Sequence, residues 1–340
     1  MKAAVFYGKN DLRVEDIPIP EVSENDVLIK VRSCGICGTD MHIFDGDEGA
    51  APTPAGTVLG HEFAGEVVKT GNQVQNVSVG DSVCVDPNKI CGYCDFCREG
   101  IGHFCENIVG IGTTVNGGFA EYCRVPKSQV YAFPKALPFE KAAMTEPVAC
   151  CLHGIDMCDI SCGDTVLIIG GGMIGLIMLQ LAKLRGAAVT VLSEPVPEKR
   201  RLASRLGADI LIDPLNEDLK AALEKHNIKR ISAVIECAGK PSAIEQAISA
   251  ASAKSTVMMF GLTKPQDTIS VKPFEIFKKE LTLRSSYINP YTQRRALDMI
   301  ASGRLDVSSM IYKTAGLDKL PGILADTKAR GAGKYIITFE

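Results

Sequence analysis

Residues 91–105, CGYCDFCREGIGHFC, hold four of the chain's thirteen cysteines. Cys91, Cys94, Cys97 and Cys105 follow the spacing C-x2-C-x2-C-x7-C. Four thiolates on one compact lobe complete the tetrahedral shell of a structural zinc ion and leave no position for water or substrate. A dithiol redox site or an iron–sulfur cluster also uses closely spaced cysteines, but the sequence has no proline after the last cysteine and no second cluster motif. The pattern therefore favours structural zinc.

A second set of possible metal ligands is spread over three motifs. Cys37 lies in SCGICGTDMH, His61 and Glu62 lie in VLGHEFAGEV, and Glu146 lies in MTEPVACCLH. Thiolate, imidazole and carboxylate groups are all zinc ligands. Each residue taken alone has an ordinary structural explanation, such as the packing of a buried thiol. Together they predict a catalytic metal site.

A glycine-rich turn marks a candidate dinucleotide site. In VLIIGGGMIG, a strand-like run ends at Gly170-x-Gly172-x-x-Gly175 and a helix-like run follows. Such a turn directs backbone N–H groups and the positive end of a helix at a pyrophosphate. The next strand-like run ends at Glu194, where a carboxylate accepts hydrogen bonds from the adenosine ribose hydroxyls. The motif predicts NAD binding.

The choice between NAD and NADP depends on charge near this ribose. The carboxylate of Glu194 would repel a 2′-phosphate, which favours NAD. Lys199, Arg200 and Arg201 on the following helix provide the counter-argument, because they could attract that phosphate. Charged residues on such a helix are usually solvated surface, so we expect NAD, with NADP as the alternative.

The elements that carry these motifs suggest two domains in 340 residues. The first 150 residues consist of short strand-like runs separated by Gly, Pro, Asn and Asp, which is typical of a β-barrel. From Asp164 onwards, strand-like runs alternate with helix-length segments (TVLII, AAVTVL, ADILI, SAVIECA, STVMMF), which predicts a parallel sheet. Near the end, TQRRALDMIASGR predicts a helix and KYIITF a strand that packs back onto the first domain.

Composition narrows the partners and the location. A net charge of -3 and a pI near 6.0 provide no basic surplus for nucleic acid or an anionic membrane. The opening MKAAVFYGKNDLRVEDIPIPEV lacks the apolar block of a signal peptide, and no long apolar run predicts a membrane span. We therefore expect a cytoplasmic protein, in which clustered cysteines bind metal or act in catalysis.

In this order, CGICGTDMH, GHEFAGEVV, VGDSV, the four-cysteine lobe, GGFAEY, EPV, GGGMIG and IECAG resemble the zinc-containing medium-chain dehydrogenases. That group includes alcohol, sorbitol and threonine dehydrogenases. The resemblance covers essentially the whole chain. It implies an α/β protein in which an amino-terminal GroES-like β-barrel catalytic domain (1–150 plus 286–340, with the zinc lobe at about 88–108) contains an inserted Rossmann, doubly wound parallel-sheet domain (151–285). It also implies NAD and two zinc ions per chain.

The resemblance assigns roles to individual residues. Cys37 and His61 match the ligands common to the family, while Glu62 and Glu146 match two acidic positions that share the catalytic metal or bind its water. Which of the two coordinates the metal at rest stays open. Because an acid and not a cysteine precedes Pro147, the chain resembles the polyol, butanediol and threonine branches.

The chemistry that this resemblance implies is hydride transfer between a secondary alcohol and NAD. Zinc stabilises the negative charge on the substrate oxygen. Thr39 resembles the hydroxyl that bonds this oxygen, and His42 resembles the imidazole that passes the proton to solvent. Alternatively, Thr39 and His42 belong to the cap of a helix that begins near Asp40. The expected cofactor contacts, beyond the three glycines and Glu194, are Met173, Ile174, Lys199, Cys237 and Gly261.

Substrate and assembly are less defined. Ile288 stands where sorbitol dehydrogenases have a polyol-binding arginine, which argues against sorbitol itself. Ser286, Tyr287 and Asn289 offer polar partners, as do Asp45 and Asp47 beside Phe44, and this set suits a neutral polyol, sugar alcohol or vicinal diol. We expect a homodimer or homotetramer. The alternatives are a threonine- or sugar-acid-type dehydrogenase, a zinc-free reductase on the same scaffold, and a non-catalytic NAD-binding protein.

Overall fold

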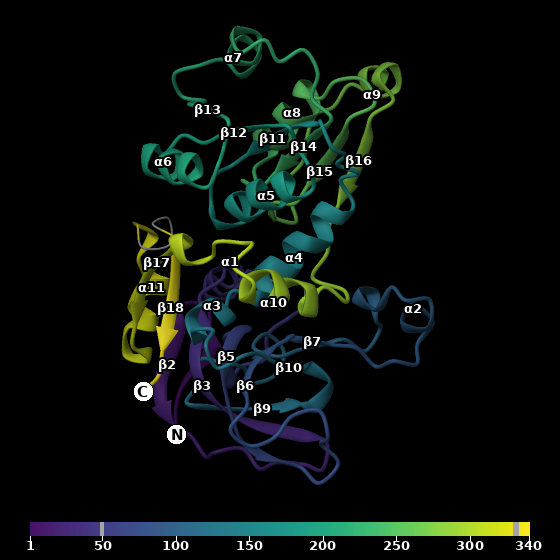
Figure 1. Cartoon of the computed structure of the whole chain (residues 1–340). Coiled ribbons are helices and arrows are strands. Elements are labelled where there is room, and N and C mark those ends of the chain that lie inside the picture. Colours follow the sequence, from purple (N-terminus) through teal and green to yellow (C-terminus); the bar gives the residue numbers. More distant parts are fainter. Residues whose placement is uncertain (48–50, 329–332) are drawn as a thin grey trace. The chain divides into compact units, whose positions relative to one another are not determined.

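Figure 1 shows the computed structural model, which describes residues 1–47, 51–328 and 333–340. The chain forms two compact units. The first comprises Met1–Ala149 and Asn289–Glu340, and the second comprises Cys150–Ile288. In the described part of the chain, no helix is long and apolar enough to cross a membrane.

The first unit is built around a large, mostly antiparallel sheet with the order β10-β6-β5-β3-β18-β17, in which β9 also pairs with β3. Two small sheets, β2-β1-β4 and β7-β8, accompany it. The strands are β1 (Lys2–Gly8), β2 (Asp11–Asp16), β3 (Asp26–Gly35), β4 (Thr57–Val58), β5 (Glu62–Thr70), β6 (Ser82–Val85), β7 (Asn88–Lys89), β8 (Val109–Gly110), β9 (Tyr122–Pro126), β10 (Val130–Ala132), β17 (Ile311–Ala315) and β18 (Lys334–Thr338).

Strand β3 is the centre of this unit. Its alternate residues Val27, Ile29 and Val31 are fully buried in the core, and β-branched side chains suit that pleated environment. Antiparallel pairing places Gly35, at the end of β3, opposite Glu62, at the start of β5. On the other side, β18 pairs antiparallel with β3, so the carboxyl-terminal strand returns to this sheet.

The helices of the first unit are short. They are α1 (Gly38–Phe44), α2 (Asp95–Arg98), α3 (Phe139–Ala142), α10 (Gln293–Ala301) and α11 (Leu320–Ala325), and α4 (Thr145–Asp156) contains the boundary between the units. The predicted helix in TQRRALDMIASGR is confirmed as α10, and the predicted strand in KYIITF is confirmed as β18.

The second unit is a parallel sheet of order β13-β12-β11-β14-β15-β16. Its elements alternate along the chain as β11 (Thr165–Ile169), α5 (Met173–Leu184), β12 (Val189–Ser193), α6 (Pro197–Arg205), β13 (Ile210–Ile212), α7 (Leu219–Lys225), β14 (Ala233–Glu236), α8 (Pro241–Ala250), β15 (Thr256–Met259), α9 (Pro273–Lys279) and β16 (Thr282–Ser285). This order is that of a doubly wound dinucleotide-binding fold.

The five strand-like runs predicted after Asp164 are confirmed as β11 to β15. Strand β16 was not predicted from the sequence, because it is only four residues long and half exposed, so its apolar signal is weak. Within the sheet, Leu167, Val234 and Val257 from the three central strands are fully buried in one core. The fold class is therefore as expected: α/β with a Rossmann-like sheet.

Candidate active site and metal centres

The pairing of β3 with β5 brings three of the predicted metal ligands together. Cys37 directly precedes α1, two residues after β3 ends, while His61 precedes and Glu62 begins β5. Because the end of β3 lies opposite the start of β5, residues far apart in sequence meet. One ligand atom from each of Cys37, His61 and Glu62 lies within 4.8 Å of the others.

Asp40 organises two members of this group. It is fully buried on the first turn of α1, and its Oδ2 accepts a hydrogen bond from the backbone N–H of Cys37 at 2.8 Å. Its Oδ1 lies 3.4 Å from Nδ1 of His61. Burial lowers the pKa of His61, but the charges of Asp40 and Cys37 outweigh it and leave that pKa well above its usual value. A carboxylate behind a ligating histidine fixes the ring and its tautomer.

Lys334 contacts Glu62, one member of the group of Cys37, His61 and Glu62. Its Nζ forms a buried ion pair with Oε2 of Glu62 and donates a hydrogen bond to the carbonyl of Ile36 at 2.8 Å. Burial lowers the pKa of Lys334, but the charges of Glu62, Cys37 and Asp40 together with the hydrogen bond to Glu62 raise it more, so the ammonium form is retained. The second oxygen, Oε1 of Glu62, is buried and has no hydrogen-bond partner among the described residues. That oxygen is available to a metal.

The other predicted catalytic residues lie in different environments. Thr39 is on α1, with Oγ1 3.7 Å from Sγ of Cys37, and His42 is one turn further along. Nδ1 of His42 lies 3.3 Å from Oδ2 of the exposed Asp47. Helix α1 begins at Gly38, two residues before the expected start. Glu146 is buried in the first turn of α4 and is not part of the three-residue group, so its role as a ligand stays a prediction.

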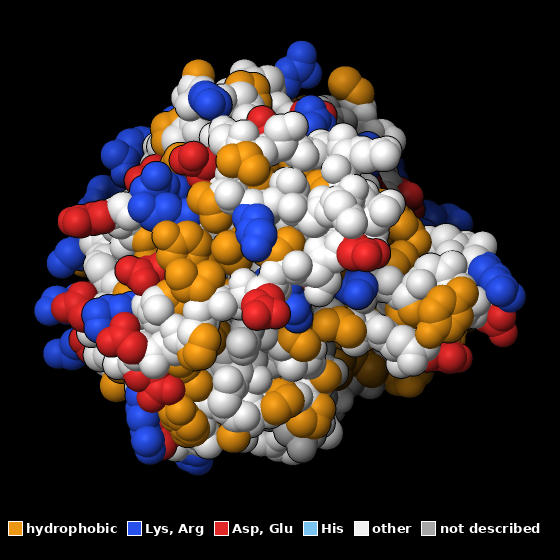
Figure 2. Space-filling view, turned by 90° about the horizontal axis from the view of Figure 1, so that it is seen from below, with side chains coloured by type: hydrophobic (Ala, Val, Ile, Leu, Met, Phe, Trp, Pro, Cys, Tyr) orange, Lys and Arg blue, Asp and Glu red, His pale blue; other side chains and the backbone are white. Residues whose placement is uncertain are grey.

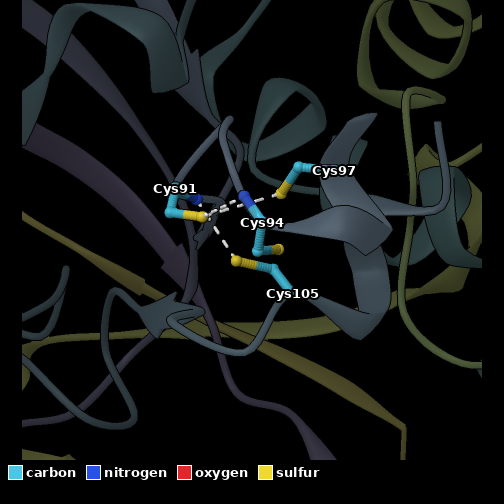
Figure 3. Close-up of side chains that lie close together, drawn as sticks. All are labelled: Cys91, Cys94, Cys97 and Cys105. Carbon is cyan, nitrogen blue, oxygen red and sulfur yellow. Dashed lines mark hydrogen bonds between the residues drawn. The ribbon is translucent and has the colours of Figure 1, made fainter. Parts of the chain in front are cut away.

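The four cysteines of the lobe converge as the spacing predicts. One sulfur from each of Cys91, Cys94, Cys97 and Cys105 lies within 4.8 Å of the others (Figure 3). The backbone N–H of Cys94 points to Sγ of Cys91 at 3.4 Å, and that of Cys91 points to Sγ of Cys105 at 3.3 Å. The N–H of Tyr93, followed by that of Cys94, lowers the pKa of Cys91 to about 6, despite burial. The lobe thus favours a thiolate at Cys91, whereas burial raises the pKa of Cys97 to about 12.

The lobe also exposes aromatic side chains. It forms the protrusion on the right of Figure 2, where hydrophobic side chains reach the surface, and Tyr93 and Phe104 are 63% and 50% exposed. All thirteen cysteines lie in the described residues and none forms a disulfide. In the described part of the chain, two groups of residues could hold a metal ion: the four cysteines of the lobe, and Cys37 with His61 and Glu62.

The glycine-rich turn joins β11 to α5 in the expected way. Gly170 has a φ of +102°, a left-handed conformation that favours glycine, and its N–H donates to the carbonyl of Ser193 at 2.8 Å. Gly175 packs directly on the carbonyl of Gly170, where a Cβ would collide. Gly172 precedes the first residue of α5, Met173, followed by Ile174. The N–H groups at such a helix start lack partners within the helix and can bind an anion.

Glu194 and Arg200 are organised next to this turn. Glu194 is buried, and its carboxylate accepts N–H hydrogen bonds from Gly171 at 2.7 Å and from Val196 at 2.9 Å. Arg200 donates to the carbonyl of Glu194 at 2.6 Å and pairs with Asp213 at 2.7 Å. The guanidinium of Arg200 is therefore already neutralised. Among the remaining predicted contacts, Lys199 is partly exposed on α6, Cys237 follows β14 and Gly261 lies just beyond β15.

Comparison with known proteins gives a consistent picture. The model of the alcohol dehydrogenase GroES-like domain matches residues 23–135, and that of zinc-binding dehydrogenases matches residues 173–302. L-threonine 3-dehydrogenase of Pyrococcus horikoshii is 35% identical over 100% of this chain and 98% of that protein. D-arabinitol dehydrogenase 1 of Uromyces fabae is 34% identical over 91% of this chain and 88% of that protein.

Solved structures agree. A zinc-binding dehydrogenase of Sinorhizobium meliloti bound to NADP has a TM-score of 0.96 and 38% identity, with 99% of each chain covered. The 2R,3R-butanediol dehydrogenase of Bacillus subtilis has a TM-score of 0.90 and 28% identity, covering 100% of this chain and 99% of that one. The chain belongs to the zinc-containing medium-chain alcohol dehydrogenase family. It is therefore an NAD(P)-dependent oxidoreductase that acts on CH–OH groups.

Both ligand groups fit the zinc of this family. Four sulfurs form a closed donor set, whereas one sulfur, one imidazole and one carboxylate leave room for a further ligand. In this medium-chain dehydrogenase, the unpartnered Oε1 of Glu62 is a buried anionic atom that a cation would satisfy.

Two residues of the catalytic group were missed in the sequence. Asp40 was considered only as part of a helix cap, although its position three residues after Cys37 places it on the same turn. Lys334 lies 272 residues after Glu62, so no local pattern connects them. Only the pairing of β18 and β5 on either side of β3 brings them together.

Two suggested substrate residues have structural roles instead. Asn289 is buried, and its side chain is bonded to Asn88 at 2.6 Å and to Gln293 at 3.2 Å. Phe44 is buried in the core of the first unit. Sequence position near an active-site motif was misleading here, because Phe44 faces the core from α1 and the side chain of Asn289 is bonded to residues of β7 and α10.

Proposed function

We propose that this dehydrogenase oxidises a secondary alcohol of a neutral polyol, sugar alcohol or vicinal diol with NAD, and that the unit formed by Met1–Ala149 and Asn289–Glu340 contains its catalytic residues. The observation that supports this most strongly is the buried group of Cys37, His61 and Glu62, with Asp40 behind the histidine. In the second unit, Cys150–Ile288, the proposed NAD site consists of the glycine turn and Glu194.

The chain's own residues prepare the substrate oxygen. A zinc ion bound here supplies positive charge that stabilises the developing negative charge on that oxygen. Asp40 holds His61, and Lys334 holds one oxygen of Glu62, so both ligand side chains are kept in one orientation. Oγ1 of Thr39, beside Cys37, accepts the hydrogen bond of the substrate hydroxyl. The partly exposed ring of His42 carries the proton to solvent.

We propose NAD as the cofactor because Glu194 and Arg200 favour it, while Lys199 and the exposed Arg201, which pairs with Glu198, keep NADP as the alternative. The carboxylate of Glu194, the proposed ribose ligand, is held beside the glycine turn by the N–H of Gly171, and Arg200 is engaged by Asp213. A 2′-phosphate would be repelled by the carboxylate of Glu194 and would not gain the guanidinium of Arg200. The NADP bound to the Sinorhizobium meliloti relative makes this a point to measure in this chain.

We also propose that the chain forms a homodimer through the open edge of its parallel sheet. In this unit β16 has β15 as its only neighbour among the described strands. Five large hydrophobic side chains are exposed in the segments that follow β15 and precede β16: Leu262, Ile269, Val271, Phe274 and Phe277. An unpaired edge beside exposed hydrophobic surface is suited to pairing with another copy.

For location, the thirteen free thiols support the proposed cytoplasmic compartment.

A substrate screen tests the function. D-arabinitol, other sugar alcohols, 2,3-butanediol, aldonates and L-threonine are supplied with NAD and then with NADP, and the absorbance of the reduced cofactor is followed. We expect turnover of a neutral polyol or vicinal diol with NAD. Turnover of L-threonine alone would favour the second candidate, which the 35% identity to a threonine dehydrogenase supports. No turnover by zinc-loaded protein on any substrate would contradict both.

A further inference from the structure

Glu236 lies at the point where the order of the strands across the parallel sheet reverses. In the sheet, β11 lies between β12 on one side and β14 on the other. Open sheets of this kind bind ligands at the carboxyl ends of those strands. Glu194 follows β12 and marks the adenosine side of the proposed site. The nicotinamide half then extends to the other side, over the end of β14. Glu236 is the last residue of β14.

The carboxylate of Glu236 is fully buried and holds the loop after β14. Oε1 accepts N–H hydrogen bonds from Ala238 at 2.6 Å and from Gly239 at 2.8 Å. The carbonyl oxygen of Glu236 accepts N–H hydrogen bonds from Phe260 and Gly261, each at 3.0 Å. The carboxylate of Glu236 therefore fixes the loop after β14, and its backbone carbonyl fixes the loop after β15.

These loops approach each other too closely for larger residues. Gly239 has a φ of +64°, and a Cβ there would lie 2.5 Å from the carbonyl oxygen of Leu262. A Cβ on Gly261 would lie 2.9 Å from Oε2 of Glu236 and 2.6 Å from the Cα of Gly239. The glycine turn takes part as well, since a Cβ on Gly170 would lie 3.1 Å from the N of Ala238.

We propose that the carboxylate of Glu236 is a positioning group that holds the loop of Ala238–Gly239, against which Gly261 packs, in the form that receives the nicotinamide half of the cofactor. This inference rests on the proposed dinucleotide site. A loop held by a buried carboxylate is pre-organised, so the cofactor does not have to order it on binding. Oε2 has no hydrogen-bond partner among the described residues, so the carboxylate is not simply one member of a saturated structural network.

The test compares NADH with ADP-ribose, which lacks the nicotinamide ring, in binding titrations of the full chain. In Glu236→Ala the dissociation constant of NADH should rise about ten- to a hundredfold, the range for losing hydrogen bonds to a charged group. The dissociation constant of ADP-ribose should change less than about twofold, because the glycine turn and Glu194 remain intact. Glu236→Gln keeps the size and one acceptor oxygen, and it should recover part of the NADH affinity.

Ser255→Ala is the matched control. Ser255 is fully buried just before β15 and donates to the carbonyl of Ile231, so its loss removes a buried hydrogen bond at the opposite end of the sheet. It should leave the affinities for both ligands unchanged. Equal losses for NADH and ADP-ribose in the Glu236 variants, or no loss for either, would overturn the inference. If Glu236→Ala does not fold, Glu236→Gln decides by the same comparison. Failure of the unmodified chain to bind ADP-ribose would instead contradict the dinucleotide site itself.

Discussion

At the residue scale, three pairs of ionisable side chains lie close together, and the first two of these pairs are buried. Asp40 lies beside His61, Lys334 beside Glu62, and Arg200 beside Asp213. Removing one partner of a buried pair leaves an uncompensated charge, which costs more than the pair contributes. Cofactor choice is the property in which such single residues should have the clearest effect.

Glu194→Ala should weaken NAD binding by about 1–3 kcal/mol, because a buried carboxylate that accepts hydrogen bonds from the ribose is lost. The relative affinity for NADP should improve, since the anion that opposes the 2′-phosphate is gone. Titration with NADH and NADPH measures both. Glu224→Ala is the control, because Glu224 is exposed on α7, away from the basic residues of α6. If the Glu194 variant binds both cofactors as before, Glu194 does not contact the ribose.

At the element scale, a polar network joins the end of β6 to α10. Oδ1 of Asp86 accepts hydrogen bonds from the N–H of Asn88 at 3.0 Å and from Nδ2 of Asn289 at 3.3 Å. Gln293 of α10 donates to the carbonyl of Val85 at 2.9 Å. Burial raises the pKa of Asp86 to about 6, although the hydrogen bonds from Asn88 and Asn289 lower it.

This pKa predicts how stability depends on pH. The pKa of Asp86 in the folded state, about 6, exceeds the unfolded value of about 3.9, so between them the folded state binds more protons. The contribution of Asp86 to the free energy of unfolding is therefore greatest below its unfolded pKa and is lost as pH rises through its folded pKa. Asp86→Asn should raise the free energy of unfolding by about 1–2 kcal/mol at about pH 8 and leave it nearly unchanged at about pH 4.

Thermal unfolding at the two pH values checks this prediction. Asp298→Asn serves as the control, because Asp298 is exposed on α10 and pairs with Arg294 at 2.9 Å. It should show no gain that depends on pH. An Asp86→Asn variant that is less stable than the unmodified chain at high pH would show that the network needs the ionised carboxylate.

The four-cysteine lobe is the second element with a direct test. Cys97→Ser should release one zinc ion per chain and lower the melting temperature, because the binding energy of a structural metal is folding energy. Elemental analysis and thermal unfolding measure the two effects. Cys162→Ser changes an exposed cysteine outside both ligand groups and should keep the metal. A Cys97 variant with full zinc content and unchanged melting would rule out a structural zinc in the lobe.

Much of this organisation was predictable from sequence, for identifiable reasons. The lobe was predictable because its four ligands lie within residues 91–105, and β11 to β15 were predictable because buried parallel strands form continuous apolar runs. Lys334 was not, because its contact with Glu62 depends on the register of β18 against β3. Asn289 was misassigned because burial depends on tertiary packing, which its local sequence does not encode.

At the scale of the whole molecule, the proposed dimer forms through the exposed edge of β16 and the hydrophobic side chains that precede it. Phe274→Asp with Phe277→Asp should shift the molar mass in light scattering from dimer or tetramer towards monomer, because charges would be buried in an apolar interface. Val79→Asp alters a side chain of comparable exposure, 63%, in the other unit and should not change the mass. An unmodified chain that is monomeric at all concentrations would contradict the dimer.

The most direct test of the proposed mechanism is kcat of His61→Ala with the substrate that the screen identifies. The variant should lose turnover by about a thousandfold or more, since the charge that stabilises the substrate oxygen is lost. Its melting temperature should fall, because the buried carboxylate of Asp40 loses its partner. The affinity of the folded variant for NADH should stay close to that of the unmodified chain, because the glycine turn and Glu194 belong to the other unit. His42→Ala should retain metal and partial activity. A folded His61→Ala protein with normal kcat would contradict the catalytic metal site.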